Sequence, residues 1–338
     1  MRYEDDIIGT PHPICLQDRQ QLSSVRQLLE CRAKLTDSEI NNRLLHDLIL
    51  KFSELEKRLK TLNRELTAKQ ERIEQDLSAA AKIQQSLLPQ RLSSPQGLDV
   101  AWKFKPCEKI GGDIFNLIQL DNEHWAIYMI DVAGHGVPAA MVAVSVFQYL
   151  QPKNGNLMMM PGDYLNTQRI RQPAAVLESL DREFTFERFN NFFTMNYVII
   201  NPKTGELASS SAGHPPPIIL RKDGTLHLLR KGGRPLGTID LLISDDEPIV
   251  YEEEHEQLRP GDKLILYTDG VNEYQNAQGG FYGNDRFYGQ LKEQKDQPVA
   301  GLVETVFKSL LDFGNNTEPK DDVSLLGMEL TDIISGLK

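Results

Sequence analysis

The chain has 338 residues, with 48 Asp and Glu against 37 Lys and Arg, and therefore a formal net charge of -11. This acidic balance argues against a nucleic-acid binder, because affinity for phosphate backbones needs a basic face. The longest unbroken apolar runs, 125–130 and 139–144, are far shorter than the roughly 20 residues of a membrane span. The first ten residues lack the basic and apolar regions of a secretory signal. We therefore expect a soluble protein without a membrane span.

The cysteine content predicts a reducing compartment. The three cysteines, Cys15, Cys31 and Cys107, are odd in number and show no metal-binding spacing, which favours the cytoplasm over a disulfide framework. The chain is 40% hydrophobic and 25% charged, as is ordinary for a globular protein, and its length allows one large domain with an additional segment.

The N-terminal quarter of the chain has a helical composition. Residues 16–88 contain neither Gly nor Pro, and the apolar positions from Leu48 to Leu66 alternate steps of four and three. This is the heptad pattern of Leu48, Phe52, Leu55, Leu59, Leu62 and Leu66 that two helices bury against each other. We predict a helix over about 48–88, about 60 Å long, that forms a parallel coiled coil and makes the protein a homodimer. The alternative is a long helix docked on its own domain.

The heptad pattern breaks before this helix ends. Lys69 and Asp76 occupy positions where the apolar residues would continue, and a broader apolar stripe then runs from Ile73 to Leu87. We hypothesise that this second part exchanges between self-pairing and docking on the following domain. The expected organisation is a helical segment of unknown role at 1–47, a coiled-coil or switch helix at 48–90, and a catalytic domain at 91–332.

From about Gly97 the pattern changes to short strands separated by turns. Turn sequences such as 201–205 and 222–224 lie between alternating stretches, which is typical of antiparallel hairpins. Helices are expected at 137–150, 174–189 and about 298–313, and 151–172 is expected to be a long loop or flap. Strands in hairpins with helices between groups of strands predict an α+β layered domain. The expected strands are 99–104, 124–131, 192–200, 205–213, 216–222, 225–230 and 262–270.

The residues that indicate chemistry are aspartates next to apolar runs or glycines. Taken singly, each is more often a turn or cap residue. Their recurrence favours convergence around a hard cation, because Mg²⁺ and Mn²⁺ prefer oxygen ligands. Two such ions would share a carboxylate and activate a water molecule for attack on a phosphoryl group. These aspartates are Asp113, Asp131, Asp269, Asp321 and Asp322.

Competing chemistries lack their residues. No cysteine has the arginine of a cysteinyl phosphatase loop six positions later, and there is no P-loop lysine or zinc-binding His-Glu-x-x-His motif. His135 lies between two glycines near Asp131. It is a candidate general acid, but a turn residue or a group that orients a ligand fits the sequence as well.

Seven ordered motifs carry a family resemblance over about residues 79–331. The motifs are AAAKIQQSLLP at 79–89, GGD at 111–113, DVAGHG at 131–136, SAGHP at 211–215, GRPLG at 233–237, YTDGV at 267–271 and KDDV at 320–323. In this order they resemble the SpoIIE/RsbU-type branch of the PPM (protein phosphatase 2C-like) bacterial serine/threonine phosphatases. The resemblance implies an αββα sandwich of two antiparallel sheets flanked by helices.

The resemblance also implies a site of two Mn²⁺ or Mg²⁺ ions. Asp131 would bridge the ions, and the backbone carbonyl of Val132 would help to hold one of them. Asp269 and Asp321 would complete the other, and Asp113 would act directly or through water. Asp131 and Asp113 are therefore the expected catalytic residues.

Two positions qualify this expectation. The family often has an acid three residues after the Asp of GGD, and this chain has Asn116 there, which puts a third metal position in doubt. His214 belongs to a motif near the site in the family, but the three prolines that follow it define a rigid turn and favour a structural role.

The resemblance finally implies a function. We expect a metal-dependent, cytoplasmic protein serine/threonine phosphatase that acts in a partner-switching signal pathway and is regulated through its dimerising helix. The expected substrate is a phosphorylated STAS-type anti-sigma antagonist or a similar regulator. One alternative is a degenerate phosphatase domain that serves as a phosphoprotein-binding scaffold, which the retained Asp131, Asp269 and Asp321 argue against. A metal-dependent nuclease is a second alternative, and the acidic charge disfavours it.

Overall fold

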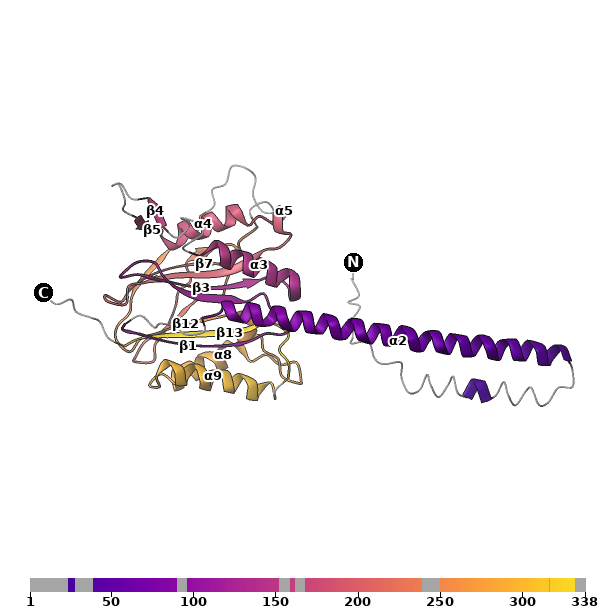
Figure 1. Ribbon diagram of the computed structural model, residues 1–338. Helices are drawn as coiled ribbons and strands as arrows, with labels where there is room; N and C mark the ends of the chain where they lie inside the picture. Colours follow the sequence, from indigo (N-terminus) through magenta and orange to yellow (C-terminus); the bar gives the residue numbers. More distant parts are fainter. Residues whose placement is uncertain are drawn as a thin grey trace. The chain divides into compact units, whose positions relative to one another are not determined.

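The computed structural model describes residues 24–27, 39–89, 96–151, 159–161, 168–238, 250–315 and 317–331. The chain forms two compact units, Met1–Gln75 and Asp76–Lys338. The division falls inside the expected switch segment 48–90, because one uninterrupted helix, α2 (Glu39–Leu87), contributes to both units (Figure 1). Within the described residues, no helix is long and apolar enough to cross a membrane.

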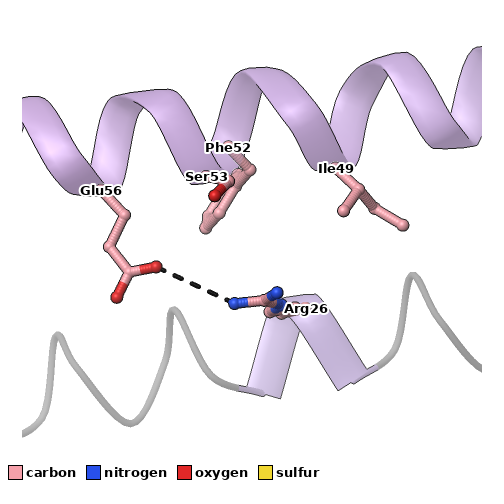
Figure 2. Close-up of a pocket in the computed structure, with 5 residues that line it drawn as sticks. All are labelled: Arg26, Ile49, Phe52, Ser53 and Glu56. Carbon is pink, nitrogen blue, oxygen red and sulfur yellow. Dashed lines mark ion pairs between the residues drawn. The ribbon is translucent and has the colours of Figure 1, made fainter.

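Helix α2 begins at Glu39, earlier than the expected Leu48, since no Gly or Pro interrupts residues 39–47. Leu48, Leu55, Leu62 and Leu66 of the heptad pattern are each about half exposed in the single chain. A helical turn at 24–27 lies beside α2, where Arg26 faces Ile49, Phe52, Ser53 and Glu56 (Figure 2). The rest of the expected N-terminal segment, including Cys15 and Cys31, lies outside the described residues.

The second unit contains a sandwich of two sheets. The five-stranded sheet has the order β1-β13-β12-β8-β9, and every strand pair in it is antiparallel. Its strands are β1 (Leu98–Lys105), β8 (Ile218–Leu220), β9 (Leu226–Leu228), β12 (Lys263–Tyr267) and β13 (Val323–Leu330).

The second sheet has the order β10-β7-β6-β3-β2, and β11 also pairs with β7. All of its pairs are antiparallel except the short β10–β7 pair. Its strands are β2 (Ile114–Gln119), β3 (Trp125–Val132), β6 (Phe193–Ile200), β7 (Glu206–Ala212), β10 (Gly232–Gly233) and β11 (Glu254–Gln257).

Helices cover both outer faces of the sandwich. Helices α3 (Gly136–Tyr149) and α4 (Pro173–Glu183) contact the six-stranded sheet, whereas α9 (Val299–Phe313) contacts β1 and β13, with α8 (Gly283–Glu293) beside it (Figure 1). Strands β3 and β6 read as nearly continuous apolar runs because they are buried on both faces. The expected αββα architecture is confirmed.

Several elements differ from the sequence-based expectation. The helix expected at 174–189 is two helices, because α4 ends before Phe184 and α5 (Phe186–Phe189) ends at Asn190, which adopts a left-handed conformation. Strands β2, β10, β11 and β13 and helix α8 were not among the expected elements. The loop expected at 151–172 contains the short hairpin of β4 (Met159–Pro161) and β5 (Gln168–Ile170); 152–158 and 162–167 lie outside the described residues.

Candidate active site

The fold brings the predicted aspartates to neighbouring strand ends. Asp113 directly precedes β2, and Asp131 lies near the end of its partner β3. Asp269 opens the short helix α7 (Asp269–Asn272) after β12, and Asp321 and Asp322 precede β13, the partner of β12. Each sheet thus supplies acids from two adjacent strands.

The charges of these aspartates act on one another. Burial raises the pKa of Asp131 to about 8, and the carboxylates of Asp269, Asp321 and Asp322 contribute to the rise. Burial, followed by the charges of Asp131 and Asp322, holds the pKa of Asp113 well above its usual range. Such a cluster of desolvated like charges is unfavourable without a counter-ion.

The pKa values of Asp269 and Asp321 are raised as well. Burial is the main cause of the raised pKa of both Asp269 and Asp321, and Asp269 is a further cause for Asp321. The cluster contains only oxygen donors and carries excess negative charge, so its chemistry fits the hard divalent cations Mg²⁺ and Mn²⁺.

Among the described residues, no three of these aspartates place ligand atoms within 4.8 Å of one another.

Asp113 is held by two hydroxyl groups. Its Oδ2 accepts hydrogen bonds from Thr268 Oγ1 (2.9 Å) and Ser324 Oγ (2.6 Å), and the residue is only 2% exposed. Both hydroxyl groups come from the five-stranded sheet: Thr268 directly follows β12, and Ser324 lies within β13. Neither residue was predicted to have a role, although Thr268 lies in the YTDGV motif.

Asp322 orients the backbone of the site. Its Oδ1 accepts a hydrogen bond from the backbone N–H of Cys107 (2.9 Å), and its Oδ2 accepts one from the backbone N–H of Asp113 (3.3 Å). Asp322 is 3% exposed, whereas the neighbouring Asp321 is only partly buried. The two adjacent acids therefore differ in role: Asp321 faces the cluster, and Asp322 binds the loop that carries Asp113.

Glycines permit these close approaches. A Cβ atom on Gly270 would lie 2.0 Å from the backbone oxygen of Asp322, and one on Gly112 would lie 2.7 Å from the backbone oxygen of Val132. The Val132 carbonyl, a predicted ligand, thus lies against the GGD segment. The loop between β3 and α3 turns at Gly134 and Gly136, which both have positive φ angles.

The two histidines near the cluster have different environments. His135 is 67% exposed at the N-terminus of α3, with Nδ1 2.8 Å from Glu108 Oε1, and its charge acts to lower the pKa of Asp321. His214 is buried, its Nδ1 lies 2.7 Å from Thr194 Oγ1, and burial lowers its pKa to about 3. Because Thr194 pairs with Asp131 across β3 and β6, His214 supports the sheet beneath the cluster.

Asn116 makes local contacts. It lies within β2, and its Oδ1 accepts a hydrogen bond from the backbone N–H of Leu117 (2.9 Å). It lies opposite Tyr128 of β3. Burial raises the pKa of the Tyr128 phenol, and Asn116 offsets part of this rise.

The C-terminal end of α2 contacts the GGD segment. The side-chain Nε2 of Gln84 donates to the backbone oxygen of Gly111 (2.7 Å), and its Oε1 accepts from the backbone N–H of the same residue (3.2 Å). Gln84 is 6% exposed. Lys109 Nζ also donates to Ser78 Oγ (3.2 Å). The apolar stripe at this end of the helix is therefore accompanied by a specific polar contact, which the sequence pattern does not predict.

An αββα sandwich with aspartates gathered at facing strand ends defines a PPM-type, protein phosphatase 2C-like domain. The model of the family "Stage II sporulation protein E (SpoIIE)" matches residues 121–331, and the chain belongs to this family. The expected SpoIIE/RsbU-type assignment is therefore confirmed.

Two relatives from Bacillus subtilis (strain 168) are phosphoserine phosphatases. RsbU is 27% identical over 259 residues, which cover 76% of this chain and 70% of RsbU. RsbP is 26% identical over 240 residues, which cover 70% of this chain and 53% of RsbP. The chain thus spans about half the length of RsbP.

Solved structures show the same fold. The SiaA-PP2C domain of Pseudomonas aeruginosa has a TM-score of 0.60 at 21% identity, covering 77% of this chain and 98% of that one. The RsbU and RsbW domains of Rv1364c from Mycobacterium tuberculosis give a TM-score of 0.55 at 24% identity, covering 70% and 60%.

Proposed function

We propose that this protein is a metal-dependent phosphatase that hydrolyses phosphoserine or phosphothreonine in a signalling protein. The observation that carries the proposal is the half-buried position of Asp131 at the end of β3 among Asp269, Asp321 and Asp322; burial, with the charges of these acids, raises its pKa to about 8. The phosphoserine phosphatase activity in the names of RsbU and RsbP supports the same reaction.

The residues proposed to hold Mn²⁺ or Mg²⁺ are Asp131, Asp269, Asp321, the Val132 carbonyl and, directly or through water, Asp113. When bound, a pair of such ions lowers the pKa of water and neutralises the oxygens of a phosphoryl group. The count of two ions is part of the proposal.

The side chains of the protein orient the Asp113 carboxylate and donate a proton. Thr268 and Ser324 hold Oδ2 of Asp113, so this carboxylate has a fixed orientation before substrate binds. Asp322 fixes the backbone of the same loop. We assign His135 as the donor of a proton to the serine or threonine oxygen that leaves, since it is exposed, acts electrostatically on Asp321 and is held by Glu108.

The proposed substrate is a phosphorylated STAS-type regulator in a partner-switching pathway in the cytoplasm. This proposal rests on the family and on the similarity to RsbU, and on a structural neighbour that combines RsbU and RsbW domains in one chain. The acidic net charge of -11 favours recognition through shape and local contacts over attraction to a negatively charged partner.

The proposed regulation uses helix α2. Its half-exposed heptad leucines provide a surface for a second copy of the helix, and Gln84 at the other end contacts the loop of Asp113 through Gly111. A change in helix pairing would reach the site through this contact. If Lys69→Leu combined with Asp76→Leu leaves both dimerisation and the phosphatase rate unchanged, the regulatory proposal is wrong.

The assay that tests the function is phosphate release from a small aryl phosphate and from a phosphoserine protein. We expect turnover with Mn²⁺, none after chelation, and loss with Asp131→Ala. Asp296→Ala, an exposed acid outside the cluster, serves as the control. The alternative scaffold function predicts phosphoprotein binding without turnover in the wild type.

A further inference from the structure

A second group of metal-binding side chains lies outside the proposed active site, where His227, Glu254 and Glu256 meet. His227 is the middle residue of β9, which is the edge strand of the five-stranded sheet. Glu254 and Glu256 alternate along β11, which pairs with β7 of the six-stranded sheet, so both side chains lie on one face of that strand. The group therefore joins the edges of the two layers of the sandwich.

The distances match a tetrahedral metal site. Nε2 of His227 lies 3.1 Å from Oε1 of Glu256 and 3.4 Å from Oε1 of Glu254, and all three atoms lie within 4.8 Å of one another. Bonds of about 2.0–2.1 Å to a tetrahedral Zn²⁺ place neighbouring ligand atoms about 3.4 Å apart. The His227 Nε2 is shielded from solvent and forms no hydrogen bond, so neither carboxylate receives an aligned N–H from it.

The other oxygen of each carboxylate is already anchored. Oε2 of Glu256 accepts a hydrogen bond from Arg221 Nη2 (2.7 Å). Oε2 of Glu254 accepts hydrogen bonds from the backbone N–H groups of Arg230 (2.9 Å) and Lys231 (3.3 Å). Each Oε1 is thereby held towards the imidazole. Metal-ligating carboxylates are held in the same way by hydrogen bonds from outer groups.

The ionised groups around His227 carry a net negative charge, which suits a divalent cation. Arg221 pairs with Glu256 and also with Asp262 (2.9 Å), so one guanidinium serves these two carboxylates. With a neutral imidazole, Glu254 together with these three groups carries two uncompensated negative charges. The side chains of Glu254 and Glu256 are only 19% and 24% exposed, so water screens these charges incompletely.

We propose that His227, Glu254 and Glu256 bind one Zn²⁺ ion that ties the edges of the two sheets together. One imidazole nitrogen and two carboxylate oxygens form a ligand set suited to zinc, with water as the fourth ligand. The aspartate cluster, in contrast, has oxygen donors alone and suits harder cations. Because the three ligands come together only in the folded chain, Zn²⁺ binding stabilises the fold.

The test is a Zn²⁺ titration of the full-length protein, with ZnCl₂ competing against a chromophoric zinc chelator. The parent protein carries Asp131→Asn and is kept in excess Mg²⁺, so that the aspartate cluster contributes little to Zn²⁺ binding. We expect one equivalent of Zn²⁺ to bind and the melting temperature to rise on binding. Adding His227→Ala should weaken this binding by about 100-fold or more, since it removes one of three ligands.

The matched control is His255→Ala in the same parent. His255 lies between the two glutamates in sequence but on the opposite face of β11, and it is 67% exposed. It should leave the affinity, the stoichiometry and the thermal shift unchanged. If His227→Ala fails to fold by circular dichroism, His227→Gln replaces it. Absence of Zn²⁺ binding by the parent, or equal Zn²⁺ affinity of the His227 and His255 variants, would overturn the proposal.

Discussion

The side-chain amide of Gln84 forms two hydrogen bonds with the backbone of Gly111, one to its carbonyl (2.7 Å) and one from its N–H (3.2 Å). Gly111 is two residues before Asp113, whose own N–H binds Asp322. The last turns of α2 are thus connected to the aspartate cluster through one short loop. This contact gives the proposed regulation a defined physical element.

Replacing Gln84 should impair the site more than replacing its exposed neighbour Gln85 does. Gln84→Ala leaves a buried backbone N–H and a carbonyl of Gly111 without their partner, which costs about 1–3 kcal/mol per group. We expect lower stability and at least a tenfold loss of kcat/KM, with a higher Mn²⁺ concentration for half-maximal rate. Gln85→Ala is the control because Gln85 is exposed. Equal Mn²⁺ dependence in the two variants would remove the proposed link.

Metal ions should stabilise the protein through the aspartate cluster. Mn²⁺ or Mg²⁺ is expected to raise the melting temperature of the wild type, because the ions neutralise buried like charges. In Asp131→Asn the shift should largely disappear. The metal-free variant should be at least as stable as the metal-free wild type, since the substitution removes a carboxylate whose pKa burial raises to about 8. Differential scanning fluorimetry measures both effects, and an undiminished metal shift would contradict the ligand assignment.

The pH dependence of stability should contain a contribution from His214. Burial lowers the pKa of His214 to about 3, so below pH 6.5 the unfolded chain binds a proton that the folded chain does not. This histidine therefore makes stability fall as pH decreases from about 6.5 towards 3, by about 1.4 kcal/mol per pH unit for one proton. The aspartates with raised pKa values act in the opposite direction.

The comparison of variants isolates this histidine. Urea unfolding measures the free energy of unfolding of each metal-free protein between pH 7 and pH 5. In His214→Asn this free energy should lack the decrease, equivalent to one proton, that the wild type shows as the pH falls. His255→Asn, which alters an exposed histidine, should keep the wild-type slope. Parallel stability curves for His214→Asn and the wild type would show that His214 is protonated in the folded protein.

Gly270 should tolerate no side chain. In Gly270→Ala the new Cβ would lie 2.0 Å from the backbone oxygen of Asp322, so α7 and the start of β13 must move apart. We expect a loss of at least about 2 kcal/mol in the free energy of unfolding. Gly289→Ala is the matched control. Its Cβ meets no atom within 4 Å and lies within α8, so we expect stabilisation of about 0.5–1 kcal/mol.

The dimer predicted from the heptads has a direct test in solution. Leu55→Ser combined with Leu62→Ser removes apolar side chains that are 53% and 54% exposed in the single chain. Light scattering coupled to size exclusion should show the wild type at twice its chain mass and this variant shifted towards one chain mass. Lys57→Ser combined with Arg64→Ser changes the same helix at exposed positions on the face opposite the heptad leucines and should remain dimeric. A monomeric wild type would contradict the dimer.

Much of the fold follows from local patterns in the sequence. The apolar runs of β3, β6 and β12 and the absence of Gly and Pro along α2 indicate these elements directly. Helix α8 was missed because only Phe287 and Leu291 of it are buried, which leaves too few apolar positions to reveal a helical period. Strand β11 was missed since its four residues, Glu-His-Glu-Gln, are all polar at a sheet edge.

The site could be predicted only in part. The positions of the aspartates follow from their motifs, and the fold brings them together. The roles of Thr268, Ser324 and Asp322 depend on contacts between residues 155 to 215 positions apart, which no local pattern reports. The same applies to His227 and its two glutamates, because the two strands belong to different sheets.

The central claim is that the aspartate cluster makes this protein a metal-dependent phosphatase. The most direct measurement is the rate of phosphate release from a phosphoserine protein as Mn²⁺ is titrated, for the wild type and for Asp131→Asn, with the fold of both confirmed by circular dichroism. We expect saturable, Mn²⁺-dependent turnover in the wild type and a loss of at least about 100-fold in the variant. A wild type without Mn²⁺-dependent turnover, or a variant that keeps it, would contradict the account.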